Sequence, residues 1–313
     1  MAHPRPFRFG VQLSRADTGP EWAELARKAE DLGYSTLFVP DHFGDQLAPV
    51  AALTAAAEAT TDLRVGPLVL DVDYRHPVVV AKEMASVDRL SGGRLELGLG
   101  AGWLASDYEQ AGIAMDPAGV RIDRLAEALD VVEGLFAAGP VTHEGKHYRI
   151  TGLDGLPKPQ QEPRPPLILG GGGPQMLSLA AQRADIVGVN PAIRSGRVDA
   201  AAALDGAAGT TDRKLGWVRE AAGARYADIE VTMLIFACVV TDDRASIIDT
   251  MAPAFGLPPE EVGDHPHAWV GTVEEICDDL VARRDRWDVS YLVVQGPEAM
   301  EAAAPIVARL AGT

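Results

Sequence analysis

The stretch "VGPLVLDVDYRHPVVVAKEMASVDRLSGGRLELGLGAGW", residues 65–103, shows the pattern that most of the chain repeats. Its first apolar run belongs to a strand predicted at 63–70, and a helix is predicted from about Val78 to Leu90. A second apolar run predicts a strand at 94–100. Apolar strands that alternate with helices are typical of a parallel sheet covered on both faces. The stretch therefore predicts a strand–helix–strand unit.

The same alternation continues in both directions from this unit. Further strands are predicted at 7–13, 35–40, 165–171, 185–190, 228–240 and 290–295, and helices at 20–33, 47–60, 119–136, 174–184, 243–254, 273–286 and 297–311. Eight strands in this α/β pattern favour a closed (β/α)8 TIM barrel over an open doubly wound sheet. A chain of 313 residues suits one such barrel with insertions, so we expect a single domain over residues 1–313.

Two segments interrupt the alternation. Residues 139–165 contain a predicted hairpin that turns at Gly145, followed by a proline-rich connection. Residues 191–227 are polar, rich in alanine and glycine, and partly helical in pattern. Long connections in a compact fold usually serve as lids or binding segments, so both segments are predicted insertions.

Composition excludes several classes of partner. The net charge of −17 argues against nucleic acid and anionic membranes, and no apolar stretch is long enough to span a bilayer. Cys238 and Cys277 form no metal-binding or redox spacing, which predicts reduced thiols in a cytoplasmic protein. The "HPH" at 265–267 has no evident third ligand, and no metal site is predicted. A small-molecule substrate is the expected partner.

Polar residues follow several predicted strands. Asp41 and His42 come directly after the strand at 35–40, and "DVDYRHP" and "GAGW" follow the next two strands. Catalytic groups of these barrels lie at the carboxyl ends of the strands. His42 is therefore a candidate proton donor or acceptor, and Asp41 is a candidate for orienting the loop or a ligand ring. The alternative is that Asp41 caps the next helix and His42 only packs.

Four glycines, Gly170 to Gly173, join a predicted strand to a helix that begins with Pro174. Backbone amides at such a junction are accessible to an anion, most naturally a phosphate. The alternative is a flexible connection. The run "GLGAG" at 98–102 does not continue as a dinucleotide fingerprint, because Trp103 stands where the third glycine is needed. Trp103 either walls a binding site or belongs to the core.

Several of these segments together resemble the luciferase-like monooxygenase superfamily, and most closely its branch that uses the deazaflavin coenzyme F420. The similarity covers nearly the whole chain in order, and it rests on "FVPDH", the stretch from Val65 to Trp103, "HEGKHYRI", "PPLILGGGGPQMLSLAAQRAD" and "VGTVEEICDDLVAR". The resemblance implies a (β/α)8 barrel with insertions. It also implies a flavin-type ring held in the barrel mouth, with hydride donated to or taken from carbon 5.

The resemblance also implies roles for individual positions. Asp41 and His42 match the pair beside the ring, with His42 as the proton carrier. Residues Leu68, Val69 and Leu70 match the support of the ring's back face, where a non-proline cis peptide is expected between Leu68 and Val69. The segment lining the ring is matched by Ala101 and Gly102, and the phosphate loop by Gly170, Gly171, Gly172 and Gly173. Trp103 replaces the catalytic glutamate of sugar-phosphate dehydrogenases in this branch, which argues against a sugar-phosphate substrate.

The resemblance predicts an F420-dependent oxidoreductase that transfers hydride between the deazaflavin ring and a small organic substrate. The alternatives are an FMN-dependent monooxygenase and a catalytically silent flavin-binding protein. A homodimer is expected through the Ala- and Val-rich helices at 47–60 and 78–90, since family members commonly dimerise there.

Overall fold

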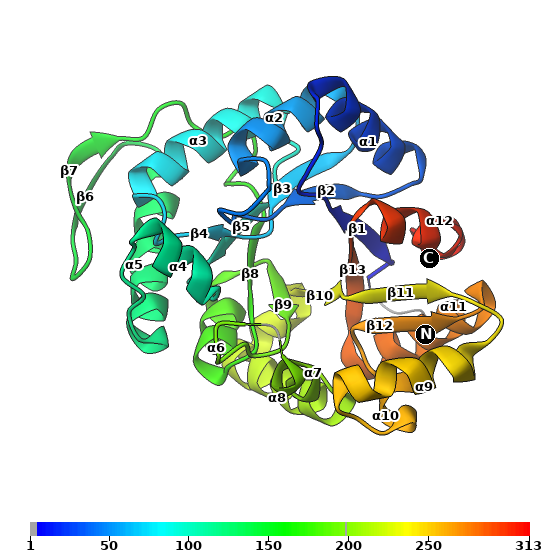
Figure 1. The fold of residues 1–313 in the computed structure, drawn as a ribbon. Coiled ribbons are helices and arrows are strands. Elements are labelled where there is room, and N and C mark those ends of the chain that lie inside the picture. Colours follow the sequence, from blue (N-terminus) through cyan, green and yellow to red (C-terminus); the bar gives the residue numbers. More distant parts are fainter. Residues whose placement is uncertain (1–4, 198) are drawn as a thin grey trace. The chain divides into compact units, whose positions relative to one another are not determined.

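The computed structural model describes residues 5–197 and 199–313. It contains two compact units: unit 1 comprises the residues up to Leu13, Lys28–Thr36 and Leu169–Thr313, and unit 2 comprises Ser14–Arg27 and Leu37–Ile168. Strands and helices alternate along the chain (Figure 1). The main sheet has nine strands in the order β3-β2-β1-β13-β10-β9-β8-β5-β4. This alternation confirms the predicted α/β class.

Unit 2 contains residues 65–103, the strand–helix–strand stretch quoted above, together with neighbouring strands and helices. Its strands are β2 (Thr36–Val39, which begins at the unit boundary), β3 (Arg64–Pro67), β4 (Leu70–Asp71) and β5 (Leu97–Gly100), and its helices are α2 (Pro49–Ala59), α3 (Pro77–Leu90), α4 (Ala105–Ala111) and α5 (Ala118–Phe136). Strands β4 and β5 pair in parallel, with Leu70 opposite Leu99. Side chains such as Phe38, Leu97 and Leu129 are fully buried, so apolar burial stabilises this unit.

The strand predicted at 63–70 is in fact two strands. Strand β3 ends at Pro67 and β4 begins at Leu70, and the peptide bond between Leu68 and Val69 is cis. This confirms the cis bond expected there. It also explains why the main sheet has nine strands where eight were predicted, because one predicted strand is interrupted at this bond.

Unit 1 contains the first strand and the carboxyl-terminal half of the chain. Its parallel strands run in the order β1, β13, β10, β9, with Phe9 opposite Leu292 and Met233 opposite the same Leu292. Its elements are β1 (Arg8–Gln12), β8 (Leu167–Gly171, which crosses the unit boundary), α6 (Pro174–Arg183), β9 (Ile186–Val189), α7 (Ala200–Asp205), α8 (Ala208–Ala222), the 3-10 helix η1 (Gly223–Asp228), β10 (Glu230–Ile235), α9 (Arg244–Phe255), α10 (Pro259–Gly263), α11 (Val273–Trp287), β13 (Val289–Gln295) and α12 (Pro297–Leu310). Helix α1 (Gly19–Asp31) has residues in both units.

The strand predicted at 228–240 is also divided. Strand β10 ends at Ile235, and β11 (Ala237–Val240) pairs with β12 (Ala268–Gly271) in a separate two-stranded parallel sheet. At the break, the Phe236 amide donates to the His267 carbonyl at 2.9 Å. The prediction of one strand was wrong because a continuous apolar run does not reveal where the chain changes its pairing partner.

The hairpin and the partly helical pattern predicted for the two interrupting segments are present. Residues 139–165 form the hairpin of β6 (Pro140–Glu144) and β7 (Arg149–Asp154), which stands out beside α5 (Figure 1). Glu127 on α5 accepts hydrogen bonds from the His147 and Tyr148 amides at 2.9 and 2.7 Å, so the hairpin turn is fixed to this helix. Segment 191–227 is partly helical, through α7 and α8.

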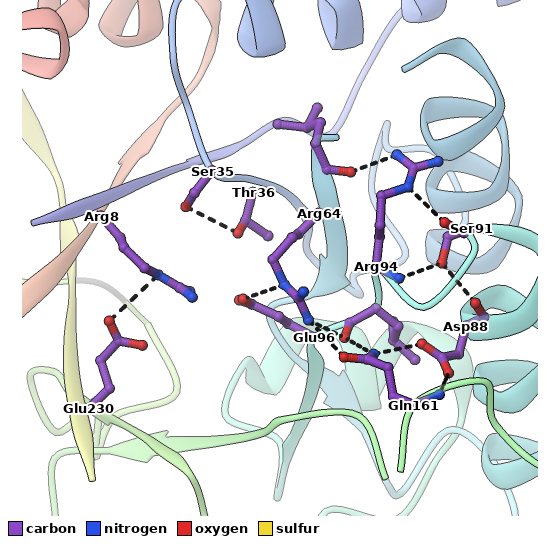
Figure 2. Close-up of polar contacts among 12 residues, drawn as sticks. Arg8, Ser35, Thr36, Arg64, Asp88, Ser91, Arg94, Glu96, Gln161 and Glu230 are labelled. Carbon is purple, nitrogen blue, oxygen red and sulfur yellow. Dashed lines mark hydrogen bonds and ion pairs between the residues drawn. The ribbon is translucent and has the colours of Figure 1, made fainter. Parts of the chain in front are cut away.

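A polar network joins the amino ends of β3 and β5 within unit 2 (Figure 2). Arg64 donates from Nε to Oε1 of the fully buried Glu96 at 2.8 Å, and from Nη2 to the side chain of Gln161 at 3.1 Å. Asp88 accepts from the Gln161 amide at 2.8 Å. These groups satisfy one another at the end of the strands opposite to Asp41 and His42, so their role is to stabilise the fold.

Of the residues that the structure describes, no helix combines the length and the apolar character that crossing a membrane requires.

Candidate functional site

His42 contacts a carboxylate that the sequence did not single out. Its Nδ1 lies 2.7 Å from Oδ2 of Asp107, whose side chain is 7% exposed. Asp107 is in the first turn of α4, a short helix that begins just after the "GAGW" segment. Because a carboxylate accepts, Nδ1 of His42 carries a proton and Nε2 is left for a ligand. The arrangement is that of an imidazole oriented for acid–base work.

Aromatic side chains surround this pair. The Trp103 ring packs edge-on against the His42 ring, with the centroids 5.5 Å apart. Tyr74 places its hydroxyl 3.4 Å from the same Asp107 oxygen and its ring 4.5 Å from Phe43. Trp103 is only partly buried and packs against His42, which favours the role of a wall over a place in the core.

Asp41 does not touch His42. Its carboxylate forms a two-pronged ion pair with Arg75, at 2.5 and 3.1 Å, and accepts from the Asp71 amide at 3.1 Å. Only 6% of Asp41 is exposed, so this pairing compensates a buried charge. The N-cap of α2 is Ala48, and the alternative that Asp41 caps this helix is wrong. Asp41 instead joins the ends of β2 and β4.

The cis bond brings Val69 over strand β5. A β-carbon at Gly100 would lie 2.5 Å from Cγ2 of Val69, and one at Gly98 would lie 3.0 Å from Cγ1. Glycine at both positions makes room for the Val69 side chain. The Leu68 amide donates to the Val39 carbonyl at 3.0 Å, which ties this turn to the strand that precedes Asp41 and His42.

Ala101 and Gly102 are held from behind by Arg121. The guanidinium donates from Nη1 to the carbonyl of Ala101 at 2.7 Å and to that of Gly102. Gly102 has φ +71°, and a β-carbon there would lie 1.8 Å from the Tyr108 hydroxyl. Both the left-handed backbone and this close approach require glycine.

A buried acidic cluster lies under Gly102. The Tyr108 hydroxyl is 2.9 Å from Oδ2 of Asp71 and 2.9 Å from Oδ2 of Asp73, and Asp73 is paired with Arg124 at 2.6 Å. A phenol has one proton, so the second contact needs a proton on a carboxyl. Burial raises the pKa of Asp71 to about 6, against the opposing effect of its hydrogen bonds. Asp71 is therefore the carboxyl that holds this proton below about pH 6.

The glycine run lies in unit 1, whereas the other predicted site residues lie in unit 2. Gly173 is the N-cap of α6 and Pro174 is in its first turn, as predicted. A β-carbon at Gly172 would lie 2.2 Å from the Ala192 nitrogen, and one at Gly171 would lie 2.7 Å from Cγ of Met176. These close approaches argue against the flexible connection, because they require glycine for packing.

A buried ion pair fixes the segment behind this turn. Lys214, which is 1% exposed, donates to Oδ2 of Asp205 at 2.5 Å and to the Asn190 carbonyl at 2.8 Å. Asp205 accepts from the Ala192 amide at 2.7 Å. Burial lowers the pKa of Lys214, although Asp205 opposes the effect. The backbone at 190–192, on which Gly172 packs, is thereby held in place.

The two histidines of "HPH" bond to the backbone. His265 places Nε2 3.0 Å from the Ala203 carbonyl, and His267 places Nδ1 2.7 Å from the Leu234 carbonyl. Within the described ranges, 5–197 and 199–313, no cluster of three His, Cys, Asp or Glu side chains is placed to hold a metal ion.

Comparison with known proteins establishes the family. A family model described as luciferase-like monooxygenase matches residues 5–303. The chain belongs to this family. A solved structure of an F420-dependent secondary alcohol dehydrogenase covers 98% of this luciferase-like chain with a TM-score of 0.78 at 19% identity, and the match covers 98% of that protein. This likeness confirms the predicted (β/α)8 TIM-barrel fold of the family.

Of two relatives of this luciferase-like protein, one is named for coenzyme F420. The 5,10-methylenetetrahydromethanopterin reductase of Methanopyrus kandleri is 30% identical over 220 residues, which is 63% of this chain and 62% of the relative. A Mycobacterium tuberculosis protein, provisionally named a coenzyme F420-dependent oxidoreductase, is 30% identical over 273 residues, which is 80% of this chain and 72% of the relative. The chain thus spans less than two thirds of the length of the first of these relatives.

Sequence reasoning missed the main partners of the predicted site residues, which are Asp107, Arg75, Arg121 and Tyr108. Arg75 stands within the "DVDYRHP" that follows the split strand, so its position at a strand end was a usable signal. Asp107 and Tyr108 lie on a helix too short to give a periodic pattern, and Arg121 lies in a helix predicted only as a covering element.

Proposed function

We propose that the protein is an F420-dependent oxidoreductase that transfers hydride between the deazaflavin ring and a small organic substrate. The observation that supports this most directly is His42, with Nδ1 held by Asp107 and Nε2 left for a ligand. It stands in a chain that has a relative provisionally named a coenzyme F420-dependent oxidoreductase. An FMN-dependent monooxygenase is the alternative, because the family model is itself described as a monooxygenase.

The residues present fit such a ring system. We assign the back of the ring to Leu68, Val69 and Leu70, where the cis bond turns the chain, and one edge to Ala101 and Gly102, which Arg121 holds. Asp41 and His42 would lie beside it. Glycines 170–173 at the start of the ten-residue helix α6 suit the phosphate, since amides of a first helical turn have no acceptor within the helix.

His42 is the proposed acid or base. The bound ring supplies the hydride-transfer centre. When a carbonyl is reduced, its carbon gains hydride and its oxygen needs a proton, which His42 in its doubly protonated imidazolium form would give from Nε2. In the reverse direction neutral His42, with its one proton on Nδ1, would take this proton at Nε2. Asp107 keeps Nδ1 protonated and holds the ring plane, so that Nε2 remains the reactive nitrogen.

Two further properties belong to the proposal. We place the protein in the cytoplasm, since Cys238 and Cys277 are free thiols. We also propose a homodimer that forms through α2 and α3; Val79 on α3 is 45% exposed. Light scattering at micromolar concentration tests the dimer, and a monomer there would refute it.

Spectral titration of the protein with F420 and with FMN tests the cofactor. We expect F420 to bind more tightly, followed by hydride transfer in a single turnover with a carbonyl or alcohol substrate. Tighter binding of FMN with oxygen consumption would favour the monooxygenase. Binding without any turnover of either coenzyme would favour a silent flavin-binding protein.

A further inference from the structure

The surface around His42 is aromatic. Phe43 follows His42 in the chain and is 50% exposed, its ring contacts that of Tyr74, and Trp103 packs edge-on against His42. An exposed aromatic side chain next to a candidate proton carrier has no role in the core of unit 2. Aromatic faces of this kind bind apolar or planar ligands, and they offer no hydrogen bond to a phosphate or carboxylate.

The cations near this surface are occupied. Arg75 is paired with Asp41 at 2.5 Å and lies 3.8 Å from Glu83. Arg124 is paired with Asp73 and Asp116. Arg121 is 8% exposed, and it donates to the backbone carbonyls of 101, 102 and 116. None of these three guanidiniums is left to bind an anionic substrate.

Carboxylates outnumber cations in the same group of side chains. Within residues 5–197 and 199–313, neither Asp71 nor Asp107 is paired with an arginine or lysine; Asp107 bonds to His42 and Tyr74, and Asp71 to Tyr108. Their negative charge affects Tyr74. Burial raises the pKa of Tyr74 most, and the charges of Asp71 and Asp107 raise it further. An anion bound next to Tyr74 would meet the same repulsion.

We propose that the substrate is an uncharged molecule with an apolar or aromatic body, bound against Phe43, Tyr74 and Trp103 with its reacting carbon near His42. The inference rests on the proposed function, because it places the substrate at the proposed proton carrier. It excludes phosphorylated and carboxylated compounds as substrates of this site.

Two probes of almost equal shape separate charge from size: 4-(hydroxymethyl)benzamide and 4-(hydroxymethyl)benzoate. Their binding is followed by NMR on the His42 ring protons, assigned with His42→Gln, first without coenzyme and then with the coenzyme that the protein binds. We expect the amide to bind at least about tenfold more tightly than the carboxylate at low salt. Equal or tighter binding of the carboxylate overturns the proposal, and so does failure of both probes to bind at millimolar concentration.

Substitutions at exposed positions test whether the surface around His42 distinguishes the amide probe from the carboxylate probe. Phe43→Arg adds a cation beside His42. It should reduce the ratio of the amide affinity to the carboxylate affinity by about tenfold. Leu90→Arg is the matched control, since Leu90 is 59% exposed at the far end of α3, next to the amino ends of the strands. Leu90→Arg should leave this affinity ratio unchanged. An unchanged affinity ratio in Phe43→Arg, or an equal reduction of the ratio in both variants, overturns the proposal.

Phe43→Ala tests the aromatic contact and should weaken binding of the amide by roughly fivefold. Unchanged affinity overturns this part of the inference. The first measurement needs no coenzyme, which keeps the two proposals separable. A protein that binds the amide but neither F420 nor FMN would refute the proposed function and leave the substrate class supported.

Discussion

Nδ1 of His42 lies 2.7 Å from Oδ2 of Asp107, and the two residues are 65 positions apart in the chain. One follows strand β2 and the other lies on α4, so the fold brings an imidazole and its orienting carboxylate together. This contact determines which nitrogen of His42 is available, and it makes Asp107 a positioning residue for the proposed proton transfer.

Replacing His42 should affect turnover more than binding. We expect His42→Ala to lower the rate of hydride transfer by about 10²–10⁴-fold, because a positioned acid or base is lost. Coenzyme affinity should change much less. Stopped-flow absorbance and coenzyme titration measure the two quantities, and full turnover in the variant would make His42 a packing residue.

Asp107→Asn should act through the imidazole. The amide no longer enforces a proton on Nδ1, so kcat should fall by about 10- to 100-fold while KM changes little. Nitrogen chemical shifts of His42 report the tautomer independently of activity. Tyr74→Phe, which removes the longer hydroxyl contact with Asp107 and leaves the bond between His42 and Asp107 in place, is the control and should retain most activity. An unchanged tautomer in Asp107→Asn would contradict the orienting role.

Asp71 should make stability depend on pH. Its pKa is raised from 3.8 to about 6 in the folded protein, so the folded state binds more protons than the unfolded state between these values. The contribution of this group therefore falls as pH rises through that window. Asp71→Asn removes the titration, and its stability relative to the wild type should increase by about 1–3 kcal/mol between about pH 4 and pH 7. Urea unfolding at both pH values checks this, and a constant difference would rule it out.

Gly102→Ala and Gly112→Ala form a matched pair. Both glycines have a left-handed backbone, with φ +71° and +69°, but a β-carbon at Gly112 meets nothing within 4 Å. Gly112→Ala should cost about 1–2 kcal/mol from backbone conformation alone. Gly102→Ala should cost about 1–3 kcal/mol more, since the new methyl displaces Tyr108. Equal costs measured by chemical denaturation would contradict the close approach.

Two ion pairs on α8 should differ in their contribution to stability. Lys214→Met leaves Asp205 without its buried partner and should cost about 2–4 kcal/mol, somewhat below the range for fully buried pairs because Asp205 is 20% exposed. Arg219→Met breaks a pair with Asp288 whose side chains are 43% and 38% exposed, and it should cost at most about 1 kcal/mol. Thermal unfolding compares the two, and the reverse order would contradict the burial argument.

The elements of the fold were largely predictable, and their interruptions were not. Alternating apolar and amphipathic stretches gave the strands, the helices and the hairpin at Gly145, because burial imposes those periods directly. The change of sheet at Phe236 follows from pairing with β12, and a single apolar run contains no mark of it. The cis bond at Leu68 was anticipated from the family resemblance and not from local propensity.

The candidate site shows the same limit. His42 and Asp41 were found because they stand at a strand end, which is a position that sequence reveals. Asp107 was missed because its importance comes from a contact across 65 residues. The partner of Asp41 was missed for a similar reason, since Arg75 is 34 positions away in the chain.

The hydrogen bonds of Lys214 end on Asn190 and Asp205, and Asp205 in turn holds Ala192, so the contacts of this ion pair close within one stretch of chain, 190–214. A segment that spans this stretch therefore contains both members of the ion pair. We expect a grafted segment to keep this pairing only if it carries both the lysine and the aspartate. A graft that carries only one of the two would bring an uncompensated charge into its new host.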